Sequence, residues 1–258
     1  EEGNTNVKVN STIAVLNGSS EDVQNNPEED IIESNKVQSD KDYDSKVKRT
    51  KNRPIASGAI SIKLALFYSI VLCFLALIVL IQFNIFTILL AICSMPLAFT
   101  YPLMKRFTYW PQLFLGITFN YGLILGWTSV NENIAIIPIL FYLGAIFWTL
   151  GYDTIYGFQD IEDDETIGVK STSIKFKKNP KIFLSICYLL FFLCYLIIGT
   201  LLDLNKYFYF GAIVVLMHLF TFQIYKFNKL NKTDCLNIFK SNNSLGLIIL
   251  VNIVIGKI

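Results

Sequence analysis

Long apolar runs without a charged side chain begin after residue 56 and constrain the fold more than any other feature of this sequence. Leu64 to Phe83 is one such run, twenty residues long. A helix needs ~20 apolar residues to cross the hydrocarbon core of a bilayer, and a chain inside that core must satisfy its own backbone hydrogen bonds. We therefore expect an all-α, polytopic transmembrane helical bundle in a lipid bilayer. Its seven spans are predicted at about 60–83, 85–104, 109–130, 134–153, 182–202, 207–226 and 243–258, with kinks at Pro96 and Pro102 in the second.

The composition agrees with a membrane protein and excludes several other classes. Hydrophobic residues make up 53% of the chain and charged residues only 16%, whereas about 25% is usual for a soluble domain. The net charge of +2 gives no reason to expect a polyanion such as a nucleic acid as a partner. The five cysteines form no CxxC or Cys/His cluster, so neither a disulfide framework nor a zinc site is predicted.

The first 38 residues differ from the rest in composition. They are rich in Asn, Ser, Glu, Asp and Val and show no sustained periodicity. Such a segment buries too little apolar surface to offset the entropy of ordering it. We expect residues 1–38 to be a disordered polar tail or insertion, and residues 39–258 to form the transmembrane domain.

The charges of the loops predict how the spans are oriented. Basic residues occur before the first span and after the second, fourth and sixth, whereas the intervening loops are nearly free of them. This alternation satisfies the positive-inside rule. The segments 39–57, 105–108, 154–181 and 226–242 are therefore expected on one side of the membrane.

Two of these same-side segments carry pairs of aspartates four residues apart: Asp40 with Asp44, and Asp160 with Asp164. Residues at this spacing share a helix face, where like charges repel unless a cation neutralises them. Mg²⁺ binds through one or two carboxylates plus substrate phosphates, so the pairs can hold metal ions on either side of a diphosphate. Ordinary solvated loops are the alternative interpretation.

Basic residues on the same side can bind the remaining diphosphate oxygens. They are Arg49, Arg53, Lys105, Arg106 and Lys170. A diphosphate at the membrane surface with an apolar tail in the bilayer is an isoprenyl diphosphate. Ionising its C–O bond produces an allylic cation, which aromatic walls can stabilise, and the chain has 21 Phe, 13 Tyr and 3 Trp.

Both acidic segments resemble the signatures of a known family. DKDYDSKVKRTKNRPIASG and DTIYGFQDIEDDETIGVKST are similar to the two motifs of the UbiA superfamily of intramembrane prenyltransferases. The stretches 99–127 (FTYPLMKRFTYWPQLFLGITFNYGLILGW) and 239–246 (FKSNNSLG) resemble the branch that prenylates 4-hydroxybenzoate in ubiquinone biosynthesis. The resemblance implies a Mg²⁺-dependent transfer of a polyprenyl chain from polyprenyl diphosphate to the ring of 4-hydroxybenzoate.

The resemblance also implies roles for individual residues. Asp40, Asp44, Asp160 and Asp164 match acidic positions of the two motifs and would bind Mg²⁺ on the diphosphate. Arg106 matches a catalytic arginine of the family, and Arg49, Arg53, Lys105 and Lys170 match basic positions that bind the diphosphate. Lys36 and Val37 stand where the family has Asn-Asp, and Lys41 stands where it often has arginine. The family fold has nine helices, so we expect this chain to contain about seven of them and to lack the first two.

Other polar residues fall in or beside the spans. Asn120 is a candidate contact to the aromatic substrate or a bond between helices, and Asp153 a candidate that orients the phenol. His218, the only histidine, is interpreted as a hydrogen-bonded buried residue rather than a general base. The alternative functions are another branch of the superfamily, a membrane transporter, or an inactive fragment. The pathway implies the mitochondrial inner membrane, or alternatively a bacterial inner membrane.

Overall fold

The computed structural model describes residues 51–258. The predictions for the segment 1–38, for Asp40, Asp44 and Arg49, and for any helix before the first motif lie outside these residues.

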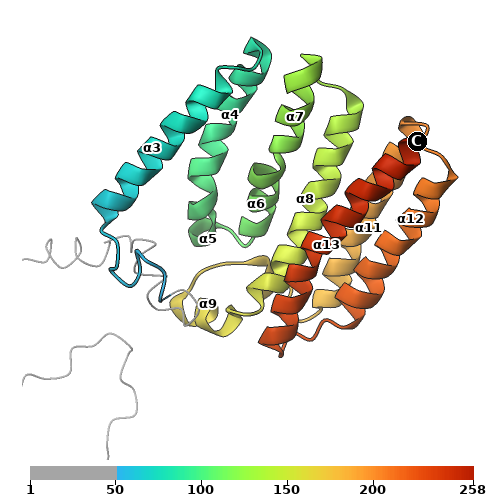
Figure 1. Cartoon of the computed structure of the whole chain (residues 1–258). Helices are drawn as coiled ribbons and strands as arrows, with labels where there is room; N and C mark the ends of the chain where they lie inside the picture. The colour runs from blue at the N-terminus through green and yellow to red at the C-terminus, as the bar shows by residue number, and fades with distance from the viewer. Residues whose placement is uncertain (1–50) are drawn as a thin grey trace, which may run out of the picture. The chain divides into compact units, whose positions relative to one another are not determined.

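Between residues 51 and 258 all regular structure is helical, and the all-α prediction is confirmed (Figure 1). Seven helical segments are long and apolar enough to cross a membrane: Ile62–Leu80, Ile85–Phe107, Pro111–Asn131, Ile136–Gly157, Pro180–Leu201, Lys206–Tyr225 and Lys232–Lys257. The elements are α3 (Ile62–Leu80), α4 (Ile85–Thr100), η1 (Tyr101–Leu103), α5 (Met104–Phe107), α6 (Pro111–Asn120), α7 (Gly122–Asn131), α8 (Ile136–Gly157), α9 (Ile161–Ile167), α10 (Thr172–Lys175), α11 (Pro180–Leu201), α12 (Lys206–Met217), η2 (His218–Tyr225) and α13 (Lys232–Lys257).

Polar side chains at the span boundaries explain where several helices begin. The side-chain oxygens of Ser61, Asn84 and Asn205 accept hydrogen bonds from backbone N–H groups in the first turns of α3, α4 and α12. Pro111 and Pro180 occupy the first positions of α6 and α11, where a missing N–H costs nothing. These signals delimit the apolar runs, so six of the seven predicted spans begin and end within four residues of the observed helical segments.

In the second span, the helix type changes at a proline. Pro96 lies inside α4, and Pro102 lies in η1, a 3₁₀ turn that separates α4 from α5. The hydroxyl of Thr100 donates to the carbonyl oxygen of Pro96 at 2.7 Å. A threonine hydroxyl that bonds the carbonyl oxygen four residues earlier often accompanies a bend in a helix.

The last span begins earlier than the sequence predicted. The expected range was 243–258, but α13 starts at Lys232 and is 26 residues long. Its first three turns are rich in Lys, Asn, Asp and Ser, so a search for charge-free runs does not detect them. Cys235, Ile238, Asn242 and Leu245 are nevertheless buried, at helical spacing, on one face of α13.

The core lies among α8, α11, α12 and α13. Tyr188 of α11 is fully buried there, and it packs so closely on Gly151 of α8 that a Cβ at position 151 would overlap its ring. The Tyr188 hydroxyl donates to Gln223 Oε1 at 2.5 Å, and Gln223 Nε2 and Trp148 Nε1 both donate to Asn242 Oδ1, at 2.9 and 2.8 Å. This buried polar network links four helical segments, one of which is the π-helix η2.

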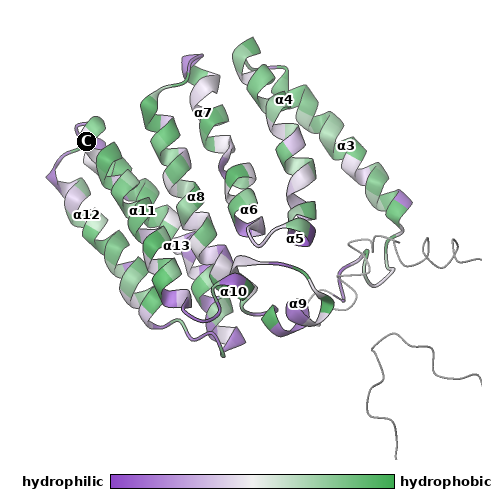
Figure 2. Ribbon diagram, turned by 180° about the vertical axis from the view of Figure 1, so that it is seen from behind, coloured by the Kyte–Doolittle hydropathy of each residue, from purple (hydrophilic) through white to green (hydrophobic). Residues whose placement is uncertain are grey.

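The loops meet at opposite ends of the helices in the order that the charge pattern predicted. The backbone N–H of Lys170 donates to the carbonyl oxygen of Lys105 at 2.8 Å, and Lys229 Nζ to that of Lys177 at 3.0 Å. The segments 105–108, 154–181 and 226–242 therefore share one end, and residues 39–50 lie outside the description. Figure 2 shows hydrophilic residues gathered around α9 and α10 at this end, while apolar residues cover the helices.

Candidate active site

A cavity of about 380 Å³ opens at the end where α9 lies. Three carboxylates and three cationic side chains share its lining, together with two tyrosines. They are Asp153, Asp160 and Asp164; Arg53, Lys105 and Lys170; and Tyr101 and Tyr156. The sequence analysis named seven candidates within residues 51–258 that would bind metal or diphosphate or, for Asp153, orient the phenol. Six of them line this one cavity, and Arg106 is the exception.

The three carboxylates come from the end of α8 and the start of α9. Asp153 and Gly157 belong to the last turns of α8, and Asp160 immediately precedes α9. The backbone N–H of Asp164 donates to the carbonyl oxygen of Asp160 at 2.8 Å, so these two residues are one helical turn apart, as their spacing predicted. Asp160 is buried, with 8% of its surface exposed.

The segment after α9 is fixed to α8 and α6 by buried hydrogen bonds. The hydroxyls of Thr154 and Thr172 lie 2.6 Å apart, and Ser173 Oγ donates to the carbonyl oxygen of Thr154 at 2.7 Å. Gln112 Oε1, at the start of α6, accepts from the backbone N–H of Thr172 at 2.9 Å. Buried polar groups cost free energy unless they are paired, so these bonds specify one position for the loop that carries Asp160 and Asp164.

Two glycines permit this arrangement. Gly157 faces Ser173, and a Cβ at position 157 would overlap Ser173 Oγ. Gly168 ends α9 with a φ of +76°, a conformation that glycine adopts without strain. The chain can then turn back over α8 toward Ser171.

The cationic side of the cavity is built by the α5 segment and Lys170. Besides its backbone bond to Lys105, Lys170 donates from Nζ to the carbonyl oxygen of Phe107 at 3.2 Å, and its Nζ lies 5.6 Å from the centroid of the Tyr109 ring. Arg106 is half-buried on α5 beside Lys105 but does not line the cavity.

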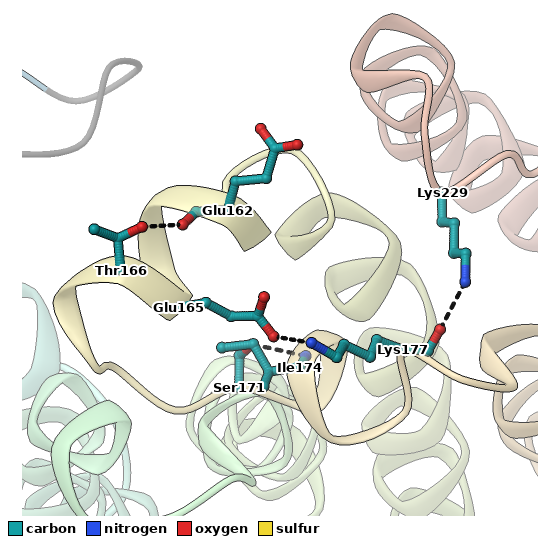
Figure 3. A network of polar contacts seen from close by, with 7 residues as sticks. All are labelled: Glu162, Glu165, Thr166, Ser171, Ile174, Lys177 and Lys229. Atoms are coloured by element: carbon teal, nitrogen blue, oxygen red, sulfur yellow. Dashed lines mark hydrogen bonds and ion pairs between the residues drawn. The ribbon is translucent and has the colours of Figure 1, made fainter. Parts of the chain in front are cut away.

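Two glutamates of α9 form ion pairs away from the cavity. Glu165 forms an ion pair with Lys177, whose carbonyl oxygen accepts from Lys229 (Figure 3). Glu162 forms an ion pair with Lys232 at 3.3 Å. The outer face of α9 is thus joined to the loops by lysines, whereas Asp160 and Asp164 line the cavity.

Two tyrosines that line the cavity, Tyr101 and Tyr156, were not among the candidates from the sequence. Tyr156 lies three residues after Asp153 in α8, so the two share a helix face, and this spacing was a usable signal. Tyr156 also begins a column of aromatic rings. Its ring centroid is 4.3 Å from that of Phe239, which is 5.7 Å from that of Tyr152, which is in turn 5.8 Å from that of Trp148.

Two other candidates lie in helix contacts. Asn120 Nδ2 donates to Thr149 Oγ1 and to the carbonyl oxygen of Gly116, each at 2.8 Å, so its amide nitrogen joins α6 to α8. The His218 Nε2 atom lies 3.2 Å from Ser241 Oγ. Within residues 51–258, no group of three or more His, Cys, Asp or Glu side chains is placed to hold a metal ion.

Sequence comparison gives relatives that are described as 4-hydroxybenzoate prenyltransferases. The chain is 44% identical over 220 residues to "4-hydroxybenzoate polyprenyltransferase, mitochondrial" of Drosophila pseudoobscura pseudoobscura, covering 85% of this chain and 55% of that protein. It is 42% identical over 222 residues to the protein of the same description from Homo sapiens, with 85% and 59% covered. The "4-hydroxybenzoate octaprenyltransferase" of Francisella tularensis subsp. novicida (strain U112) is 37% identical over 219 residues, with 85% and 77% covered. The chain thus spans little more than half the length of its animal relatives.

Solved structures share the fold. A UbiA homologue from Aeropyrum pernix K1 superposes with a TM-score of 0.71 at 21% identity, covering 85% of this chain and 82% of that one. Digeranylgeranylglyceryl phosphate synthase superposes with a TM-score of 0.61 at 18% identity, covering 84% and 77%. The model of the UbiA prenyltransferase family matches residues 38–245, from before the first acidic motif to the FKSNNSLG stretch. On this match, and on identities of 37–44% to the relatives, the chain belongs to the UbiA prenyltransferase family.

Proposed function

We propose that this protein transfers a polyprenyl chain from polyprenyl diphosphate to the ring of 4-hydroxybenzoate, a step of ubiquinone biosynthesis. The observation that carries the proposal is the cavity in which Asp160 and Asp164 lie with Lys105 and Lys170. Carboxylates and ammonium groups that share one cavity suit a metal-bound diphosphate. The descriptions of the relatives support the choice of prenyl acceptor.

We propose Mg²⁺ as the metal, because the donor set fits it. Asp160 and Asp164 offer hard carboxylate oxygens one helical turn apart, and Mg²⁺ is usually held by one or two carboxylates plus substrate phosphates. Asp40 and Asp44, outside the described residues, are proposed to hold metal in the same way. When bound, the metal supplies positive charge to the oxygens of the diphosphate.

The cationic side chains of the cavity are proposed to stabilise the leaving group. When the C–O bond breaks, its electron pair moves to the diphosphate, and negative charge grows on the diphosphate oxygens. Lys105, Lys170 and Arg53 line the same cavity and can donate charge-assisted hydrogen bonds to these oxygens. Arg106 and Arg49 are proposed to add positive charge.

The prenyl carbocation then reacts with the aromatic acceptor. The ring carbon ortho to the hydroxyl group forms the new C–C bond, and the proton on that carbon leaves. Asp153 lines the cavity one turn before Tyr156 and is proposed to orient the phenol. Asn120 can offer only its carbonyl oxygen to the acceptor, because its amide nitrogen bonds α6 and α8. The rings of Tyr156 and Phe239 can stabilise the cation from one side.

The seven apolar helices support a place in a membrane. The animal relatives are described as mitochondrial, and we propose the mitochondrial inner membrane for this chain, with a bacterial inner membrane as the alternative suggested by the Francisella relative.

A radiochemical assay tests the proposed function. Membranes that contain the protein are incubated with a labelled polyprenyl diphosphate, 4-hydroxybenzoate and Mg²⁺, and the lipid extract is analysed for a prenylated benzoate. A naphthoate acceptor in a parallel reaction distinguishes other branches of the family. Product in the 4-hydroxybenzoate reaction and not in the naphthoate reaction supports the proposal. Product in the naphthoate reaction only contradicts it.

A further inference from the structure

A second hollow, of about 580 Å³, lies between the start of α11 and the end of η2. Four lysines line it: Lys178, Lys181, Lys226 and Lys229. Its lining contains no Asp or Glu and shares no residue with the candidate active site. The proposed prenyl transfer gives this hollow no role.

The four lysines differ from the other lysines of the neighbouring loops. Lys177 and Lys232 form ion pairs with Glu165 and Glu162. By contrast, within the part of the chain that the structure describes, none of the four lysines around the hollow pairs with a carboxylate. Like charges around one hollow repel, and an anion placed between them relieves that repulsion. The positive-inside rule accounts for lysines in these loops but not for their convergence on one hollow.

Hydrogen bonds hold the two sides of the hollow together. Lys181 Nζ donates to the carbonyl oxygen of Tyr225 at 3.2 Å, which joins α11 to the end of η2. Lys229 Nζ donates to the carbonyl oxygen of Lys177 at 3.0 Å, which joins the following loop to the segment before α11. Lys226 Nζ lies 4.4 Å from the centroid of the Phe222 ring. Contacts within the fold therefore position three of the four ammonium groups.

The position of the hollow relative to the bilayer identifies the kind of anion. Pro180 begins one apolar span and Tyr225 ends another, so the hollow lies where the spans reach the membrane surface. Tyr225 is exposed, as is usual for tyrosine at this depth. Exposed apolar side chains continue from the hollow along one face of α11, at Ile182, Ile186, Leu189 and Leu193.

We propose that this hollow binds the phosphate headgroup of an anionic phospholipid, whose acyl chains lie along the exposed face of α11. Basic pockets between membrane helices bind anionic headgroups in this way. A phospholipid matches both the charged hollow and the apolar face beside it. The lysines contact its phosphate, and the exposed side chains from Ile182 to Leu193 contact its acyl chains.

Native mass spectrometry of the purified protein tests the proposal. The probes are phosphatidylglycerol and phosphatidylcholine with identical acyl chains, and inorganic phosphate is the competitor. The double variant Lys178→Gln/Lys226→Gln removes two charges but keeps the bonds made by Lys181 and Lys229. Lys63→Gln/Lys240→Gln removes the same charge outside the hollow and is the matched control, and thermal unfolding confirms that both variants fold.

The expected result is that phosphatidylglycerol binds more tightly than phosphatidylcholine. The hollow variant should bind phosphatidylglycerol on the order of tenfold more weakly, while the control matches the unaltered protein. The proposal is overturned if phosphatidylglycerol binds equally to the unaltered protein, the hollow variant and the control variant. It is also overturned if the unaltered protein binds the two lipids equally. Displacement of phosphatidylglycerol by a low concentration of inorganic phosphate would show that the site binds the free ion and would overturn the lipid assignment.

Discussion

The carboxamide oxygen of Gln112 accepts a hydrogen bond from the backbone N–H of Thr172, 2.9 Å away, and joins the start of α6 to the segment that follows α9. Both residues are buried. Replacing Gln112 with alanine should leave this N–H without its partner, at a cost of about 1–3 kcal/mol, and should loosen the loop that carries Asp160. Thermal unfolding in detergent and the prenyl-transfer rate should both fall. Gln82→Ala, which removes an exposed amide near the end of α3, should change neither.

Gly157 offers a steric test of the same loop. A Cβ at this position would overlap Ser173 Oγ, and Ser173 is fully buried. Gly157→Ala should destabilise the protein by about 1–3 kcal/mol and lower the transfer rate. Gly126→Ala makes the same substitution in α7, where nothing lies within 4 Å of the new Cβ. An unaltered rate and melting temperature for Gly157→Ala would contradict the close packing of these segments.

Asp160 and Asp164 should be required for the reaction and for its dependence on metal. Asp160→Asn and Asp164→Asn should each lower kcat/KM at least a hundredfold, equivalent to about 3 kcal/mol, because neutral amides bind Mg²⁺ poorly. Chelation should abolish activity, and added Mg²⁺ should restore it in the unaltered protein. Glu165→Gln, on the same helix but paired with Lys177, is the matched control. Full activity of both aspartate variants would refute the proposed site.

Lys170 should act on the diphosphate rather than on the acceptor. Lys170→Met keeps an unbranched side chain of similar length and the backbone bond to Lys105 but removes the charge. KM for the polyprenyl diphosphate should rise and kcat should fall, since the proposed role of the ammonium group is to stabilise charge that grows as the C–O bond breaks. The KM for 4-hydroxybenzoate should stay the same, and Lys240→Met should change neither KM. An effect confined to the KM for 4-hydroxybenzoate would assign Lys170 to the other substrate.

Asn242 should stabilise the bundle. Its carbonyl oxygen accepts from both Trp148 Nε1 and Gln223 Nε2, so Asn242→Ala leaves two donors unpaired inside the helices. The expected loss of stability is about 1–2 kcal/mol, in the range measured for polar contacts between membrane helices. Unfolding in a denaturing detergent measures it. Asn237→Ala, an exposed position on the same helix, should have no measurable effect.

The spans were predictable because each is an unbroken apolar run between caps or prolines. The same reasoning missed the start of α13, since burial there depends on Cys235 and Ile238 packing among polar neighbours. The helical turn between Asp160 and Asp164 followed from their spacing. Their meeting with Lys105 and Lys170 was expected from their shared side of the membrane. The backbone bond between Lys170 and Lys105 was not predicted, because it joins segments far apart in the sequence.

Asn120 shows a second limit of sequence reasoning. A polar side chain within an apolar span is equally expected at a substrate and at a helix contact, and only the placement of Thr149 opposite its amide reveals the contact. Tyr156 shows the reverse case. Its position between Asp153 and Asp160 was sufficient to place it on the cavity face, but aromatic residues are so frequent in the spans that none stood out.

The bond between the Lys170 N–H and the Lys105 carbonyl oxygen uses main-chain atoms alone. Any residue except proline at position 170, and any residue at position 105, can therefore preserve it. The two side chains that it places at the cavity can therefore be replaced without altering the path of the loop. Substitutions at either position should change the binding of the diphosphate while the loop stays folded.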